Sequence, residues 1–73
     1  MNRIANISQI GKLVRTKRKA MKLTQKDLAG LCNLGTRFVS ELENGKKTLE
    51  IEKVLKVLTS VGISIDLSDR KVS

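Results

Sequence analysis

Apolar residues recur every three or four positions along most of the chain, and this period predicts four helices separated by short turns. The first helix begins near Asn6 or Ser8, either of which suits an N-cap, and ends at about Ala20 or Met21. We expect its apolar stripe to face the core; the stripe consists of Ile7, Ile10, Val14 and Met21, with Leu13 beside it.

The second helix has the clearest start signal in the chain. Thr24 stands at the N-cap and Asp27 at the third helical position, which is the spacing of a capping box. Leu23 and Leu28 are placed to form a hydrophobic staple across the same turn. We expect this helix to end around Cys32, whose small apolar side chain suits the core better than a redox-sensing role.

A tight turn and a third helix follow. Asn33 is the best non-glycine residue for the left-handed backbone that a sharp helix-to-helix turn requires. The third helix runs from about Thr36 to Asn44 and stops at Gly45. Residues 25–44 therefore have the pattern of a helix-turn-helix.

The fourth helix is predicted from an N-cap at Thr48 to about Ser60, with Gly62 ending it. Residues 63–67 then alternate apolar and polar side chains, which is the period of a strand. A lone strand leaves backbone groups unpaired, so we favour pairing with a second copy over a frayed tail. The expected inward face of the helix is Ile51, Val54, Leu55, Leu58 and Val61, and the dimerisation residues are Ile63, Ile65 and Leu67.

These elements predict an all-α fold of four helices with a C-terminal β-strand shared across a homodimer. Residues 1–62 would form the helix-turn-helix domain, 63–67 the dimerisation strand and 68–73 a flexible tail. A 73-residue chain buries only about 60% of its unfolded surface, and such small domains often need oligomerisation.

The composition argues against an enzyme and against a metal or cofactor site. The chain has no histidine and one cysteine, so it offers no disulfide, no metal-ligand cluster and no catalytic Ser-His or Cys-His pair. A phosphate-binding glycine loop is also missing. Phe38 is the single aromatic residue, which disfavours single-stranded nucleic acid, and we expect it in the core rather than as an intercalating wedge.

The formal net charge is +8, and all of the excess lies in the first third of the chain. Residues 1–26 contain eight basic residues and no acidic ones, whereas the basic and acidic residues beyond them balance. This asymmetry suits nucleic acid or an anionic membrane surface, and a merely solvated face is the alternative. No spanning segment or signal peptide is visible, so we expect a cytoplasmic, nucleoid-associated protein without a membrane partner.

The segments LTQKDLA and RFVSELENGK, and the span from about Gly11 to Leu67, resemble the Cro/C1 (XRE) helix-turn-helix family, which implies a lambda-repressor-like domain. The run from Leu34 to Leu67 is most similar to HipB-type antitoxins. That resemblance implies a dimeric operator-binding protein that pairs with a HipA-type serine/threonine kinase toxin. It also implies a structural ion pair between Arg18 and Glu43. Two departures from the family are Asn33, where glycine is usual, and Gly35, where many relatives have a capping serine or threonine.

The third helix is expected to lie in the major groove of double-stranded DNA. Arg37 is our first choice for guanine readout, with a phosphate contact as the alternative. Thr36 would touch a thymine methyl or a phosphate, and Glu41 would accept from cytosine or hold Arg37. The expected base contacts are Thr36, Arg37, Ser40 and Glu41; the expected phosphate contacts are Gln25, Lys26, Lys46 and Lys47, with Arg15, Lys19 and Lys22 as weaker candidates.

We therefore predict a transcriptional repressor that binds a pseudo-palindromic operator, as the autoregulating antitoxin of a HipA-type kinase. One rival is a stand-alone phage or metabolic repressor without a toxin. A second is a partner-binding antitoxin whose DNA binding is incidental. A third treats the first helix as a basic amphipathic segment on a membrane surface, although its apolar stripe is better used in the core.

Overall fold

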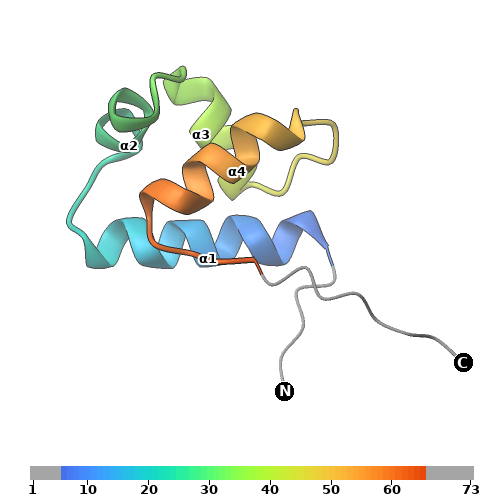
Figure 1. Cartoon of the computed structure of the whole chain (residues 1–73), viewed down its shortest axis with the longest axis horizontal. Coiled ribbons are helices and arrows are strands. Elements are labelled where there is room, and N and C mark those ends of the chain that lie inside the picture. Colours follow the sequence, from blue (N-terminus) through green and yellow to red (C-terminus); the bar gives the residue numbers. More distant parts are fainter. Residues whose placement is uncertain (1–5, 66–73) are drawn as a thin grey trace, which may run out of the picture.

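The computed structural model describes residues 6–65, which form four helices joined by short turns. In chain order these are α1 (Ile7–Ala20), α2 (Gln25–Cys32), α3 (Thr36–Glu43) and α4 (Ile51–Ser60). The helix α1 lies along one side of the molecule and the other three lie over it (Figure 1). The chain beyond α4 turns back and runs beside α1 (Figure 1). The predicted four-helix, all-α fold is confirmed.

The ends of α1 follow from local hydrogen bonds. The side-chain oxygen of Asn6 accepts from the backbone N–H of Gln9 at 3.0 Å, so Asn6 rather than Ser8 is the N-cap. At the other end Met21 is the C-cap, and Lys22 then adopts a left-handed backbone conformation with φ of 59°. This conformation reverses the chain toward α2.

The core lies between the helices and draws apolar side chains from all four of them. Val14 of α1 and Val39 of α3 are fully buried, and they pack with residues of α2 and α4 in one cluster. Close packing of this kind supplies most of the stability of a small helical domain. The buried apolar residues are Val14, Leu28, Ala29, Cys32, Val39, Leu42, Val54, Val57, Leu58 and Val61.

Three residues expected in the core are instead exposed. Met21 is 46% exposed because it lies beyond the last turn of α1. Ile51 and Leu55 of α4 are 63% and 41% exposed, while Val57, which the expected inward face omitted, is fully buried. The apolar arc of α4 is wider than its contact with the other helices, and Ile51 and Leu55 lie on the uncovered edge.

The predicted N-cap of α4 is wrong. The helix begins at Ile51 with Glu50 at the N-cap, and no side chain caps it. Thr48 lies in a turn two residues before that cap. Leu49 packs against the core between them, and anchoring this side chain delays the start of the helix.

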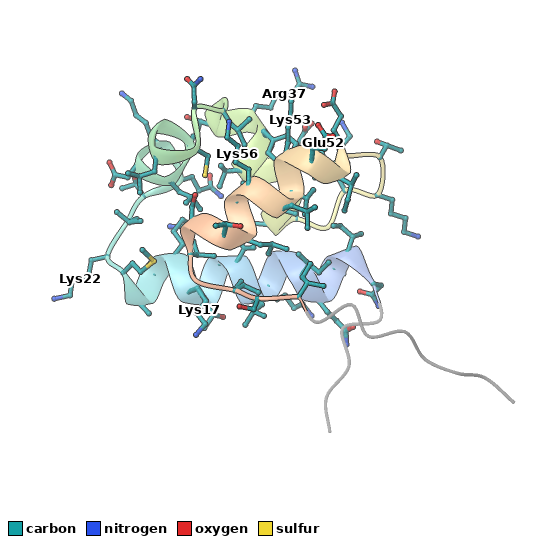
Figure 2. All side chains as sticks on the ribbon, viewed as in Figure 1. Lys17, Lys22, Arg37, Glu52, Lys53 and Lys56 are labelled. Carbon is teal, nitrogen blue, oxygen red and sulfur yellow. The ribbon has the colours of Figure 1, made fainter. Side chains whose placement is uncertain are left out.

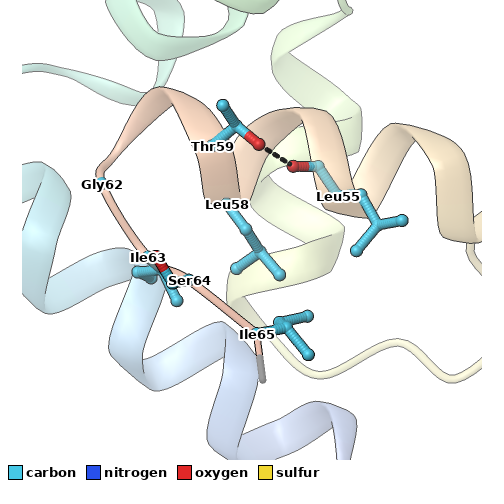
Figure 3. Close-up of a pocket in the computed structure, with 7 residues that line it drawn as sticks. All are labelled: Leu55, Leu58, Thr59, Gly62, Ile63, Ser64 and Ile65. Atoms are coloured by element: carbon cyan, nitrogen blue, oxygen red, sulfur yellow. Dashed lines mark hydrogen bonds between the residues drawn. The ribbon is translucent and has the colours of Figure 1, made fainter. Parts of the chain in front are cut away.

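The predicted strand remains untested. Within the described chain, residues 63–65 follow α4 without forming a strand, and Leu67 lies outside the described residues. Ile63 packs against the core, whereas Ile65 is 40% exposed. Leu55, Leu58 and Ile65 gather around an open apolar pocket at this point (Figure 3).

Gly11 marks the closest approach of α1 to α3. A Cβ atom at this position would lie 2.2 Å from the carbonyl oxygen of Leu42 and 2.9 Å from that of Glu43. Real atoms do not approach so closely, so only glycine allows this crossing of the two helices. Gly11 is itself buried in the contact.

Candidate nucleic-acid interface

The start of α2 is fixed by the predicted capping box. The Thr24 hydroxyl oxygen accepts from the backbone N–H of Asp27 at 3.0 Å, and the Asp27 carboxylate accepts from the backbone N–H of Thr24 at 2.9 Å. Hydrogen bonds to the Asp27 carboxylate from Thr24, first of all from its backbone N–H, lower the pKa of Asp27. The two residues that follow the cap, Gln25 and Lys26, are therefore held at the positive end of α2.

The turn between α2 and α3 has the predicted left-handed residue. Asn33 has φ of 56° and ψ of 44°, and its backbone N–H donates to Gly30 at 3.2 Å. Leu34 packs against the core, which sets the angle between the helices. Gly35 is the N-cap of α3, and no side chain makes a capping hydrogen bond there.

The outer face of α3 carries the residues predicted to read DNA. Thr36 and Arg37 are exposed in its first turn, and Ser40 and Glu41 are half-buried one turn further on. The Arg37 side chain is 88% exposed. It points away from α1, on the side of the molecule opposite Lys17 (Figure 2).

Glu41 holds two basic side chains from different elements. Its Oε2 atom accepts from Nε of Arg37 at 3.3 Å and from Nζ of Lys46 at 3.1 Å. The hydrogen bond from Lys46, followed by that from Arg37, lowers the pKa of Glu41. The sequence indicated the Arg37 contact from its i,i+4 spacing but gave no sign of the Lys46 contact.

The end of α3 positions the second basic pair. The backbone N–H of Gly45 donates to Leu42 and that of Lys46 donates to Glu41, both at 3.0 Å. With Gly45 at φ of 81°, these bonds form a Schellman motif. Lys46 and Lys47 leave this motif exposed to solvent beyond the C-terminal end of α3.

A buried ion pair joins α1 to α3. Arg18 donates from Nε and Nη2 to the two carboxylate oxygens of Glu43, at 2.6 Å and 2.9 Å. Its Nη1 donates to the carbonyl oxygen of Leu23 at 2.8 Å. The Gln25 amide also donates to Glu43, at 3.1 Å. This network ties the first residue of α2 to α3, so Gln25 is held by protein contacts at the place expected for a phosphate contact.

The charges of this pair are stabilised by hydrogen bonding. Burial raises the pKa of Glu43, but hydrogen bonds from Arg18 and Gln25 outweigh it, and the net shift is downward. The hydrogen bond to Glu43 raises the pKa of Arg18. No buried side-chain polar atom within residues 6–65 lacks a partner.

A model of the helix-turn-helix family, HTH_3, matches residues 14–68, which cover most of the chain. The chain belongs to the helix-turn-helix family. It is also 49% identical over 65 residues to an uncharacterized HTH-type transcriptional regulator, y4mF, of Sinorhizobium fredii, covering 89% of this chain and 86% of that one. This helix-turn-helix protein is therefore a DNA-binding transcriptional regulator.

Solved structures of other proteins have the same fold. A HipA–HipB–O2–O3 complex contains a chain similar to this helix-turn-helix protein, with a TM-score of 0.83 and 24% identity. The match covers 97% of this protein and 100% of that chain. The restriction-modification controller protein C.AhdI from Aeromonas hydrophila gives a TM-score of 0.70 at 30% identity. The match covers 82% of this protein and 87% of the controller protein. The resemblance to HipB noted in the sequence thus extends to the fold.

Two features of the helix-turn-helix protein were missed in the sequence. One is the close contact of Gly11 with α3. A glycine inside a helical pattern indicated some special role for this position, but the sequence did not identify α3 as its neighbour. The other is that the side chains of Lys46 and Arg37 both donate to the same carboxylate oxygen of Glu41. Within residues 6–65 no helix is long and apolar enough to cross a membrane, and no cluster of potential metal ligands is found.

Proposed function

We propose that this protein represses transcription by placing α3 in the major groove of its operator. The observation that carries the proposal is the exposed first turn of α3, with basic residues on both sides of it. Arg37 would make a bidentate contact to a guanine, and Thr36 and Ser40 would approach the neighbouring bases. Lys26 on one side and Lys46 and Lys47 on the other would contact flanking phosphates.

The decisive experiment compares two duplexes by fluorescence anisotropy. One has the DNA upstream of the gene, the other has the same bases scrambled, and both are titrated over a salt series. We expect strong preference for the native duplex, and a salt slope that indicates about six or more neutralised phosphates. Equal, weak binding to both duplexes would contradict the proposal.

Two variants separate base readout from phosphate contact. Arg37→Ala should weaken binding to the native duplex by about 1–3 kcal/mol and leave the scrambled duplex nearly unaffected. Lys47→Ala should weaken both duplexes alike and lower the salt slope by about 0.9 per lost contact. If Arg37→Ala leaves native binding unchanged, DNA binding through α3 is incidental, as the partner-binding alternative requires.

The operator would be a pseudo-palindrome read by a homodimer. The exposed apolar residues Leu55 and Ile65 support this, because both line an open pocket where the chain leaves α4, and Ile51 at the start of that helix is exposed as well. Pairing of residues 63–67 across a two-fold axis would extend the same patch into a shared strand. The half-sites would then lie about one helical turn of DNA apart.

The regulator would further act as the antitoxin of a HipA-type serine/threonine kinase and repress its own operon. The support is the likeness of the whole described fold to HipB, which was solved in a complex with HipA. The test is co-expression with the kinase encoded beside the gene. Stable co-purification and relief of growth arrest are expected, and an uninhibited kinase would contradict the antitoxin role.

A stand-alone regulator is the second candidate. Its support is the likeness to the controller protein C.AhdI, which is 30% identical and covers 82% of this chain. Operator preference together with failure to bind any neighbouring kinase would select this candidate. Both candidates use the same face of α3, so the anisotropy experiment does not depend on the choice between them.

A further inference from the structure

The carboxylate of Glu41 lies between the two cations that flank the outer face of α3. Its Oε2 atom accepts from Arg37, in the first turn of α3, and from Lys46, beyond the end of that helix. Both contacts are made by one oxygen atom, so the three side chains form a single cluster. We refer to Arg37, Glu41 and Lys46 as the α3 clamp.

The backbone brings the three residues of the clamp close together. Arg37 and Glu41 are one helical turn apart, a spacing at which side chains on a helix are neighbours. The backbone N–H of Lys46 donates to the carbonyl oxygen of Glu41, so the Schellman motif sets Lys46 over the same residue. Lys46 therefore contacts Glu41 twice, once through its backbone N–H and once through its side-chain ammonium.

The three side chains differ in how far solvent reaches them. The Glu41 side chain is 27% exposed, whereas those of Lys46 and Arg37 are 46% and 88% exposed. The carboxylate is therefore the inner member and the two cations are the outer ones. Any phosphate that approaches this face meets the cations first, with the carboxylate behind them.

We propose that Glu41 sets the specificity of DNA binding by restraining Arg37 and Lys46, so that neither cation is free to bind phosphates at random. The inference rests on the proposed function of α3. A phosphate that takes either cation must displace the carboxylate and approach its negative charge. A correctly placed guanine accepts from the Arg37 guanidinium through O6 and N7, and because its edge is uncharged it brings no second negative charge against Glu41, as an arbitrary phosphate does. Glu41 is thus a positioning residue that selects against non-specific duplexes.

The test is Glu41→Gln, measured by fluorescence anisotropy on the native upstream duplex and on the scrambled duplex over a salt series. With the charge removed, we expect the scrambled duplex to bind about two- to tenfold more tightly. The salt slope should steepen by about 0.9 for each phosphate gained. The native duplex should gain less, so the ratio of the two affinities falls. An unchanged ratio or an unchanged slope would overturn the inference.

Glu52→Gln is the matched control, because it removes one exposed carboxylate from α4 and raises the net charge equally (Figure 2). It should leave the ratio of affinities unchanged. If the ratio of native-duplex to scrambled-duplex affinity falls equally in both variants, net charge alone sets that ratio. This result would overturn the role of Glu41. The melting temperatures of both variants should stay close to that of the natural chain, because exposed ion pairs contribute little to stability.

A second control removes the cations. In an Arg37→Ala, Lys46→Ala background, Glu41→Gln should leave binding to the scrambled duplex unchanged, because no cation remains to be released. A persistent gain in affinity for the scrambled duplex would show that Glu41 repels DNA directly and would overturn the restraint.

Failure of the proposed function would give a different result, namely that the natural chain itself shows no preference for the native duplex. The scrambled-duplex affinities and slopes would in that case still show whether Glu41 restrains the two cations.

Discussion

At the scale of single residues, two glycines in helices have opposite roles. Gly11 allows α1 to cross α3, since an added Cβ would lie 2.2 Å from the carbonyl oxygen of Leu42. Gly30, on the exposed side of α2, has nothing within 4 Å of a Cβ position. Sequence patterns treat both as helix-weakening residues, yet only one of them is required by packing.

We expect Gly11→Ala to lower the free energy of unfolding by about 1–3 kcal/mol, because α1 and α3 must move apart. Gly30→Ala should raise the same free energy by about 0.5–1 kcal/mol, because alanine favours the helix and meets no neighbour. Thermal unfolding followed by circular dichroism would measure both. A neutral or stabilising Gly11→Ala would show that the crossing is looser than the structure indicates.

The buried pair of Arg18 and Glu43 gives the second prediction at this scale. Glu43→Ala leaves the Arg18 guanidinium buried without its carboxylate, and should lower the free energy of unfolding by about 3 kcal/mol. Glu50→Ala removes an exposed carboxylate that lies 3.7 Å from Lys53, and should cost less than about 1 kcal/mol. Equal melting temperatures for the two variants would contradict a structural role for the buried pair.

At the scale of elements, the start of α2 links stability to pH. Hydrogen bonds from Thr24 lower the pKa of Asp27 in the folded state. A lowered pKa means that the charged form stabilises the fold above the unfolded-state pKa, and that this contribution disappears as the pH falls through the folded-state pKa. Asp27→Asn should therefore destabilise the protein at neutral pH and have little effect in acid. Urea unfolding of both proteins at pH 7 and in acid measures this, and a difference that persists in acid would refute it.

The elements also show what the sequence could predict. The capping box at Thr24 and Asp27 and the left-handed Asn33 were predicted correctly, because each depends on residues close together in the chain. The start of α4 was not, because Glu50 caps it without a side-chain bond and the packing of Leu49 decides where the helix begins. Local signals identify a helix end where a capping side chain or a glycine makes it, and α4 begins without either.

The same limit applies to the candidate site. The expected DNA-reading residues of α3 share one face because their spacing is helical, and that face was predictable. The contact between Lys46 and Glu41 was not, since it depends on how the chain folds back at Gly45. A glycine after a helix predicts that the helix ends, but not which side chain the next residue meets.

At the scale of the whole molecule, the apolar arc of α4 exceeds what the other described residues, within 6–65, cover. Periodicity assigned Ile51 and Leu55 to the core because it cannot distinguish a face buried within the chain from one left for a partner. In the structure both are exposed, and Leu55 lines the same pocket as Ile65 (Figure 3). An uncovered apolar edge beside the expected strand is what a small domain that completes its core by dimerisation would have.

If the proposed homodimer buries this edge, Leu55→Lys should convert it into a monomer, because the lysine charge would have to be buried against the second copy. Sedimentation velocity across a concentration series would measure the change, and the weaker dimer should bind the native duplex less tightly. Leu31→Lys is the matched control, since Leu31 of α2 is equally apolar, 64% exposed and outside the pocket. If both variants sediment as the natural chain does, the α4 edge is not a dimer interface. If both dissociate, the loss reflects added charge rather than a specific surface.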